Sequence, residues 1–135
     1  PTNNIATKHS IPVLIVARSD RMREGLKIVL QCKPWIKLVG QTDKSASALE
    51  MVSQYHPALV ILDTNLSNNG TWLIVLKQVK AESPQTRCLV LTDPVQRLQA
   101  ARAAGADAVL MKGFAMTKLF AAIERLLSLG EDNNE

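Results

Sequence analysis

Short apolar runs alternate along the chain with stretches whose apolar residues recur every three or four positions. A continuous apolar run bounded by polar residues predicts a strand that is buried on both faces. Apolar positions at the helical spacing predict a helix with one buried stripe. The predicted strands are residues 11–17, 37–41, 59–62, 88–91 and 108–111. The predicted helices are residues 20–31, 44–55, 70–82, 93–104 and 115–129.

The regular alternation of strands and helices predicts an α/β fold of the (βα)5 type. Apolar strands separated by helices form a parallel sheet whose two faces are both covered by helices. Because crossover connections are right-handed, few topologies remain, and the flavodoxin-like (CheY-like) strand order 2-1-3-4-5 is the one we expect. Residues 11–129 then form one domain, flanked by a flexible N-terminal segment, residues 1–10, and a polar tail, residues 130–135.

Composition narrows the classes of function. The net charge of +4 comes from singly scattered Lys and Arg, and only 4% of the residues are aromatic, so we expect no direct nucleic-acid binding by this domain. Cys32 and Cys88 lack a metal-like spacing, and we expect reduced, at least half-buried thiols in a cytoplasmic protein. No apolar run reaches the length of a membrane span, so we expect no membrane contact.

Candidate chemistry gathers where the predicted strands end. Asp63, Thr92 and Lys112 each follow an apolar run directly. The carboxyl ends of parallel strands lie at one edge of the sheet, where such folds place their ligands, so these three side chains should converge. The first strand instead runs into Ala17 and Arg18. A G-x-G-x-x-G turn and a phosphate loop are both missing from the sequence, which disfavours nucleotide binding.

Several blocks in this order resemble the receiver domain of bacterial two-component response regulators. The matching blocks are residues 13–16, 23–26, 57–63, 89–92 and 104–112, and the resemblance covers residues 11–129. It implies that Asp63 is the phosphoacceptor and that Thr92 and Lys112 bind the phosphoryl group. The chemistry is coherent, since a carboxylate acts as nucleophile while donors and cations stabilise the transferring oxygens.

The sequence departs from the family at the metal site. The family holds Mg²⁺ with an acidic pair, and Ala17 and Arg18 occupy the matching positions. Mg²⁺ prefers hard oxygen ligands, so we expect no cofactor and at most weak Mg²⁺ binding, with Asp63 as a weak candidate ligand. We expect Ser19 or Asp20 to cap the first helix, and we expect Asp20 to have this role rather than to replace the lost pair. Val109 stands where many family members carry an aromatic switch residue.

The roles of the site residues leave alternatives. Asp63 is either a working phosphoacceptor or a remnant held by Lys112 in a structural ion pair. We expect Lys112 to lie in the pocket, and Arg18 to pair with Asp63 rather than point to solvent, because an unpaired charge in a pocket is unfavourable. We expect Thr92 to cap the helix that follows Asp93, a role that does not exclude phosphoryl binding.

The expected function is that of an atypical receiver domain, a signalling and protein-interaction module rather than an enzyme. It would not be switched by the usual Mg²⁺-dependent aspartyl phosphorylation. By resemblance, a protein partner or output domain would bind the fourth helix, fifth strand and fifth helix, a surface that could also form a homodimer. The alternative is a conventional receiver, phosphorylated on Asp63 by a histidine kinase and controlling a DNA-binding output domain. A third interpretation is a flavodoxin-like cofactor binder.

Overall fold

The computed structural model describes residues 10–66, 70–93 and 95–127. The predicted flexible segment, apart from Ser10, lies outside these ranges, as do the predicted tail and the end of the last predicted helix. The strands are β1 (Ile11–Val16), β2 (Ile36–Thr42), β3 (Leu59–Asp63), β4 (Arg87–Thr92) and β5 (Ala108–Met111). The helices are α2 (Asp20–Leu30), α3 (Ser45–Tyr55), the short 3-10 helix η1 (Thr64–Leu66), α4 (Thr71–Glu82), α5 (Gln96–Ala103) and α6 (Met116–Leu126).

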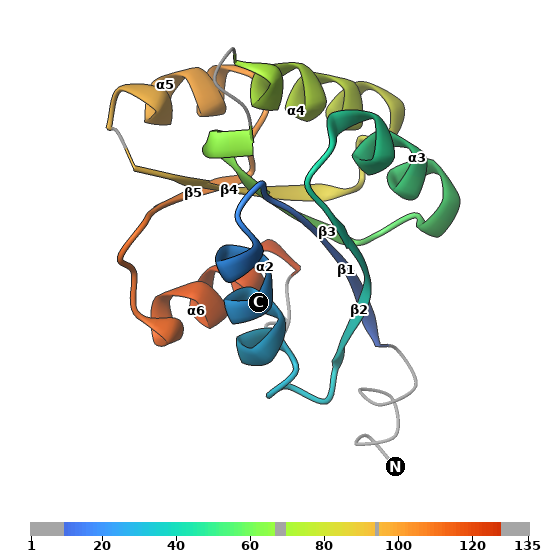
Figure 1. The fold of residues 1–135 in the computed structure, drawn as a ribbon, viewed down its shortest axis with the longest axis vertical. Coiled ribbons are helices and arrows are strands. Elements are labelled where there is room, and N and C mark those ends of the chain that lie inside the picture. The colour runs from blue at the N-terminus through green and yellow to red at the C-terminus, as the bar shows by residue number, and fades with distance from the viewer. Residues whose placement is uncertain (1–9, 67–69, 94, 128–135) are drawn as a thin grey trace, which may run out of the picture.

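The five strands form one parallel sheet in the order β2-β1-β3-β4-β5 (Figure 1). This confirms the predicted flavodoxin-like fold. The register pairs Asp63 of β3 with Leu91 of β4, and Thr92 of β4 with Met111 of β5. The carboxyl ends of the three strands are therefore nearly level, which brings the polar residues that end them to the same edge.

Helices cover both faces of the sheet, with α3, α4 and α5 on one side and α2 and α6 on the other (Figure 1). Side chains alternate between the faces along each strand. Val13 and Ile15 of β1 pack with α2 and α6, whereas Leu14 and Val16 pack with α3 and α4. Double coverage explains why the strands read as unbroken apolar runs.

A polar capping residue marks the start of α2, whereas α5 begins three residues later than predicted. Ser19 is the N-cap of α2 and its hydroxyl accepts a hydrogen bond from the Met22 amide at 3.2 Å. The helix η1 was not predicted, because one helical turn is too short to show periodicity. Cys88 is buried as expected, but Cys32 is exposed, contrary to the prediction, since it lies just past the end of α2. No described helix has both the length and the apolar character needed to cross a membrane.

A partly buried polar cluster joins α4 to the start of β4 and β5. Lys80 Nζ donates to Asp107 Oδ2 at 2.9 Å and to the carbonyl of Thr86 at 2.9 Å. The Cys88 amide also donates to Asp107 Oδ2, at 2.8 Å. Burial raises the pKa of the Cys88 thiol to about 12, so this thiol stays protonated at neutral pH. The Lys80–Asp107 pair therefore satisfies backbone groups at the end of the sheet opposite to the Asp63 edge.

Replacing Lys80 by Met should lower the free energy of unfolding by about 1–3 kcal/mol. Methionine keeps an apolar stem but leaves Asp107 and the Thr86 carbonyl without their ammonium donor. Lys77→Met on the exposed side of the same helix is the matched control and should change stability by less than about 0.5 kcal/mol. Urea denaturation of both variants measures the difference, and equal midpoints would contradict the prediction.

Candidate functional site at the carboxyl edge of the sheet

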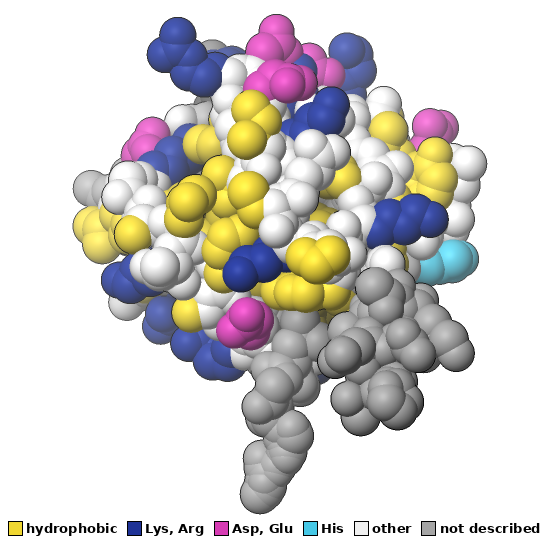
Figure 2. All heavy atoms as spheres, turned by 90° about the horizontal axis from the view of Figure 1, so that it is seen from below, with side chains coloured by type: hydrophobic (Ala, Val, Ile, Leu, Met, Phe, Trp, Pro, Cys, Tyr) yellow, Lys and Arg dark blue, Asp and Glu magenta, His cyan; other side chains and the backbone are white. Residues whose placement is uncertain are grey.

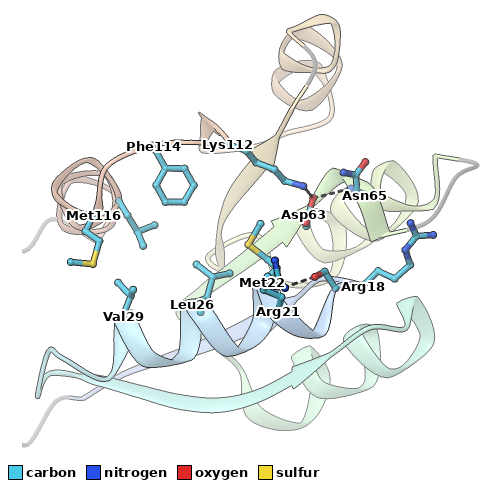
Figure 3. A pocket seen from close by; sticks show the side chains of 13 residues that line it. Arg18, Arg21, Met22, Leu26, Val29, Asp63, Asn65, Lys112, Phe114 and Met116 are labelled. Carbon is cyan, nitrogen blue, oxygen red and sulfur yellow. Dashed lines mark hydrogen bonds and ion pairs between the residues drawn. The ribbon is translucent and has the colours of Figure 1, made fainter.

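The structure brings Asp63, Thr92 and Lys112 together, as the strand ends predicted. Lys112 Nζ lies 2.7 Å from Asp63 Oδ1, and the Lys112 amide donates to the Thr92 carbonyl at 2.9 Å. Figure 3 shows the Lys112 side chain reaching along the pocket to the Asp63 carboxylate. Parallel pairing explains the convergence, since each residue stands at the carboxyl end of a neighbouring strand.

Asp63 is buried, with 3% of its side chain exposed. Its Oδ1 atom accepts a hydrogen bond from the Asn65 amide at 2.9 Å in addition to the contact with Lys112. Lys112 is 17% exposed, and its ammonium also lies 3.9 Å from Oδ2 of the more exposed Asp93. The carboxylate thus already has a cationic partner and a backbone donor on one oxygen.

Thr92 does not cap a helix. It is buried in β4, and its Oγ1 accepts a hydrogen bond from the Thr64 hydroxyl at 3.1 Å. Helix α5 begins at Gln96 with Val95 as its N-cap, so three residues separate Thr92 from the first helical residue. The predicted capping role is therefore wrong, because the connection after β4 is longer than the sequence pattern indicated.

The segment after β1 is held by Arg23. Its Nη1 atom donates to the Ala17 carbonyl at 2.7 Å and to the Arg18 carbonyl at 2.9 Å. The other guanidinium nitrogen forms an ion pair with Asp20 in the first turn of α2. Of the two residues predicted to cap the helix, Ser19 is the N-cap, whereas Asp20 binds Arg23 instead.

The predicted Arg18–Asp63 ion pair is also wrong. Arg18 is exposed, and its side chain points away from Asp63 in Figure 3. Lys112 already occupies the contact position on the buried carboxylate. A guanidinium that stays hydrated avoids the desolvation that a second buried cation would require. Within the described ranges, the Arg18 side chain forms no ion pair.

Arg97 of α5 also contacts the site, although the sequence analysis did not predict it. Its Nη1 atom donates to the Thr64 carbonyl, the Thr64 hydroxyl and Asn65 Oδ1, each at 3.2 Å. Asn65 in turn donates from Nδ2 to Asp93 Oδ2 at 3.2 Å. This network ties α5 to the loop after β3. No pattern in the sequence indicated this network, because Arg97 is more than 30 residues from Thr64 and Asn65 along the chain.

A pocket of about 550 Å³ extends from Asp63 between α2 and α6. At one end lie Asp63, Asn65, Lys112, Arg18 and Arg21, and the rest is mainly apolar (Figure 3). Figure 2 shows the face that carries α2 and α6, where hydrophobic side chains gather with Lys and Arg side chains among and around them. The pocket was not predicted, because it depends on how far apart two helices pack.

Replacing Asp63 by Asn should lower the free energy of unfolding by about 1–3 kcal/mol without changing the fold. Asparagine keeps an oxygen for the Asn65 amide but leaves Lys112 without its close anionic partner. Adding Lys112→Met to this variant should recover part of the loss, since removing both charges costs less than orphaning one. Urea denaturation of the three variants measures the coupling. Strictly additive effects would show that the ion pair contributes nothing.

Comparison with known proteins agrees with this geometry. The family model of the response regulator receiver domain matches residues 13–124. The Fimbriae Z protein of Salmonella typhimurium is 30% identical over 118 residues, which are 86% of this chain and 56% of that protein. The transcriptional regulatory protein PmrA of Pectobacterium parmentieri is 32% identical over 117 residues, which are 85% and 51% of the two chains. The chain spans about half the length of these curated relatives.

Solved structures show the same fold. The isolated REC domain of RcsB from Salmonella enterica serovar Typhimurium superposes with a TM-score of 0.79 at 20% identity, covering 93% of this chain and 94% of that one. The signal receiver domain of NarL from Mycobacterium tuberculosis also gives 0.79, at 23% identity, covering 91% and 99%. The family model matches most of the length of this chain. The chain therefore belongs to the response regulator receiver domains, which are the signalling modules of two-component systems.

Proposed function

We propose that this receiver domain signals through protein contacts and is not switched by Mg²⁺-dependent phosphorylation of Asp63. The observation that carries the proposal is the pair Ala17 and Arg18, which stands where the family resemblance places the metal-binding carboxylates. The domain would then act as an interaction module and would not catalyse its own phosphorylation.

The oxygen atoms around Asp63 fit Mg²⁺ poorly. This ion needs about six oxygen ligands in near-octahedral geometry. The carbonyl oxygens of Ala17 and Arg18 already accept hydrogen bonds from Arg23, and Asp20 is paired with the same guanidinium. Asp63 Oδ1 contacts Lys112. Among the described residues, no three His, Cys, Asp or Glu side chains cluster as a metal site would require.

The net charge around Asp63 also disfavours Mg²⁺ binding. Arg18 and Lys112 are two cations against the single carboxylate of Asp63, so these three residues carry a formal charge of +1. A divalent cation approaching Asp63 meets repulsion from Lys112 at contact distance and from Arg18 at the pocket mouth. In this arrangement Lys112 acts as a built-in counter-ion that holds Asp63 in one state.

We infer that the partner is an output domain or another protein that binds the surface made by α5, β5 and α6. We call this the α5–β5–α6 surface, and its exposed or half-buried members include Val95, Leu98, Arg102, Met111 and Lys118. Val95 is 65% exposed and Met111 38%, with charged side chains beside them. Apolar residues within a polar rim are typical of protein interfaces. Because the matched relatives are about twice as long, a DNA-binding output domain is the partner we propose.

Sedimentation of this chain over a wide concentration range tests whether the surface forms a protein contact, with a second copy of the chain as the partner that the assay can detect. We expect association through the α5–β5–α6 surface that is unchanged by Mg²⁺ and acetyl phosphate. Leu98→Glu and Lys118→Glu should each weaken it at least about tenfold, as expected for residues central to an interface. Tyr55→Glu, at an exposed site at the end of α3, is the control and should have no effect. A monomer at every concentration would show that the surface does not join two copies of the chain, and association that requires the phosphoryl donor would contradict the proposal.

The alternative is a conventional phosphoacceptor receiver, served by a histidine kinase. The observation in its favour is the convergence of Asp63, Thr92 and Lys112 at one sheet edge. Under that alternative, Lys112 would move from Asp63 to the phosphoryl oxygens. Rapid modification of Asp63 by a small phosphoryl donor would support it.

A further inference from the structure

The pocket beside Asp63 has the size and lining of a small-molecule site. Its volume of about 550 Å³ falls within the range of roughly 300–1,000 Å³ found for ligand pockets. Met22, Leu26 and Val29 of α2 face Phe114 and Met116 across it (Figure 3). An apolar body of a ligand would lie between α2 and α6 and displace water from these side chains.

Gly25 keeps this pocket open. It lies inside α2 and lines the pocket, and a Cβ atom built on it meets no other atom within 4 Å. Its backbone is helical, so no left-handed conformation requires glycine here. Glycine inside a helix is less stable than alanine or leucine. Neither close packing nor a left-handed backbone therefore requires glycine at this position, and a larger side chain has room beside the pocket.

The polar end of the pocket is positively charged. Arg18, Arg21 and Lys112 line it together with one carboxylate, Asp63, which leaves a formal charge of +2. Arg18 and Arg21 are exposed and form no ion pair within the part of the chain that the structure describes. A ligand with one negative group would find donors there, since guanidinium groups bind carboxylates and phosphates through paired hydrogen bonds.

We propose that the pocket binds a small amphipathic anion. Its apolar chain lies between α2 and α6, and its carboxylate or similar head enters the positively charged end that Arg18, Arg21 and Lys112 line. Because Lys112 Nζ is 2.7 Å from Asp63 Oδ1, an anionic head that reaches Lys112 competes with Asp63 for this ammonium. Ligand occupancy would then alter the pair at the centre of the receiver site. Ligand binding in this pocket does not require the proposed protein contacts, so it is expected even if the α5–β5–α6 surface does not associate.

Decanoate, titrated into the isotope-labelled chain below its micelle concentration, is the probe. We expect saturable amide shifts that centre on Gly25, Lys112 and Phe114. Decanol should bind at least about tenfold more weakly, and decyltrimethylammonium weaker still, because only the anion gains charge-assisted hydrogen bonds. Equal responses to the three probes would reduce the site to a non-specific apolar patch and overturn the proposal.

Two variants make the test specific. Gly25→Leu should fill the pocket and weaken decanoate binding at least about tenfold while thermal stability is kept or raised, since leucine favours the helix. Arg21→Gln should weaken the binding of decanoate but not that of decanol, and Lys77→Gln on the exposed side of α4 is the charge-matched control. If Gly25→Leu bound decanoate with unchanged affinity, the proposal would be wrong. Chemical-shift changes at the same amides when the protein is diluted without decanoate would also contradict the proposal, because they would identify a second copy of the chain as the occupant of the pocket.

Discussion

Replacing Ala17 and Arg18 together by Asp should create a magnesium site next to Asp63. Two cations and one carboxylate would become one cation and three carboxylates, so the formal charge of the site would change from +1 to −2. Hard oxygen ligands would then surround the position next to Asp63. We expect a dissociation constant for Mg²⁺ at or below about 1 mM in this variant and no saturable binding by the unmodified chain in that range.

Calorimetry and thermal melts measure the effect independently. Ala17 is 1% exposed, so an aspartate there buries a carboxylate beside other carboxylates and should destabilise the metal-free variant. Mg²⁺ should restore its melting temperature by binding only the folded state, while the unmodified chain should not respond. Ala17→Asn with Arg18→Asn is the control of similar size without the charges. Saturable binding to the unmodified chain below about 1 mM would refute the prediction.

The fold and the centre of the site could be predicted because both depend on strong local patterns. Apolar runs such as residues 59–62 are buried on both faces, and the polar residue after each run must come to the carboxyl edge. Asp63, Thr92 and Lys112 were found in this way. Parallel pairing of the strands then places these three residues at the same edge of the sheet, independently of the conformation of the surrounding loops.

The side-chain contacts around this centre could not be predicted, because they depend on the loops. Arg18 was expected to face Asp63, but it turns to solvent while Lys112 fills the contact. Arg97 reaches Thr64 only because the connection after β4 places α5 above the loop after β3. Lys80 and Asp107 likewise meet across 27 residues. A long, flexible cation can reach several partners, and only tertiary packing chooses among them.

Acetyl phosphate should modify Asp63 only slowly in the unmodified chain. In the reaction the Asp63 carboxylate attacks phosphorus, the bond from phosphorus to the acetate oxygen breaks, and acetate leaves. Negative charge on the transferring oxygens then has to be stabilised by cations and donors. Lys112 is the only cation in contact with Asp63 among the described residues, and it is engaged with Asp63 Oδ1 before the donor arrives. Arg18 is displaced toward solvent.

The double variant Ala17→Asp with Arg18→Asp should react at least about 100-fold faster in Mg²⁺ than the unmodified chain, a gain typical of one well-placed electrostatic contact. Intact-mass time courses with and without Mg²⁺ give the rates, and Asp63→Asn in each background shows whether the added mass lies on Asp63. Mg²⁺ should leave the slow rate of the unmodified chain unchanged. If the unmodified chain reacted rapidly and only with Mg²⁺, Ala17 and Arg18 would not impair phosphoryl transfer, and Lys112 would have to serve as the phosphoryl ligand of a conventional receiver.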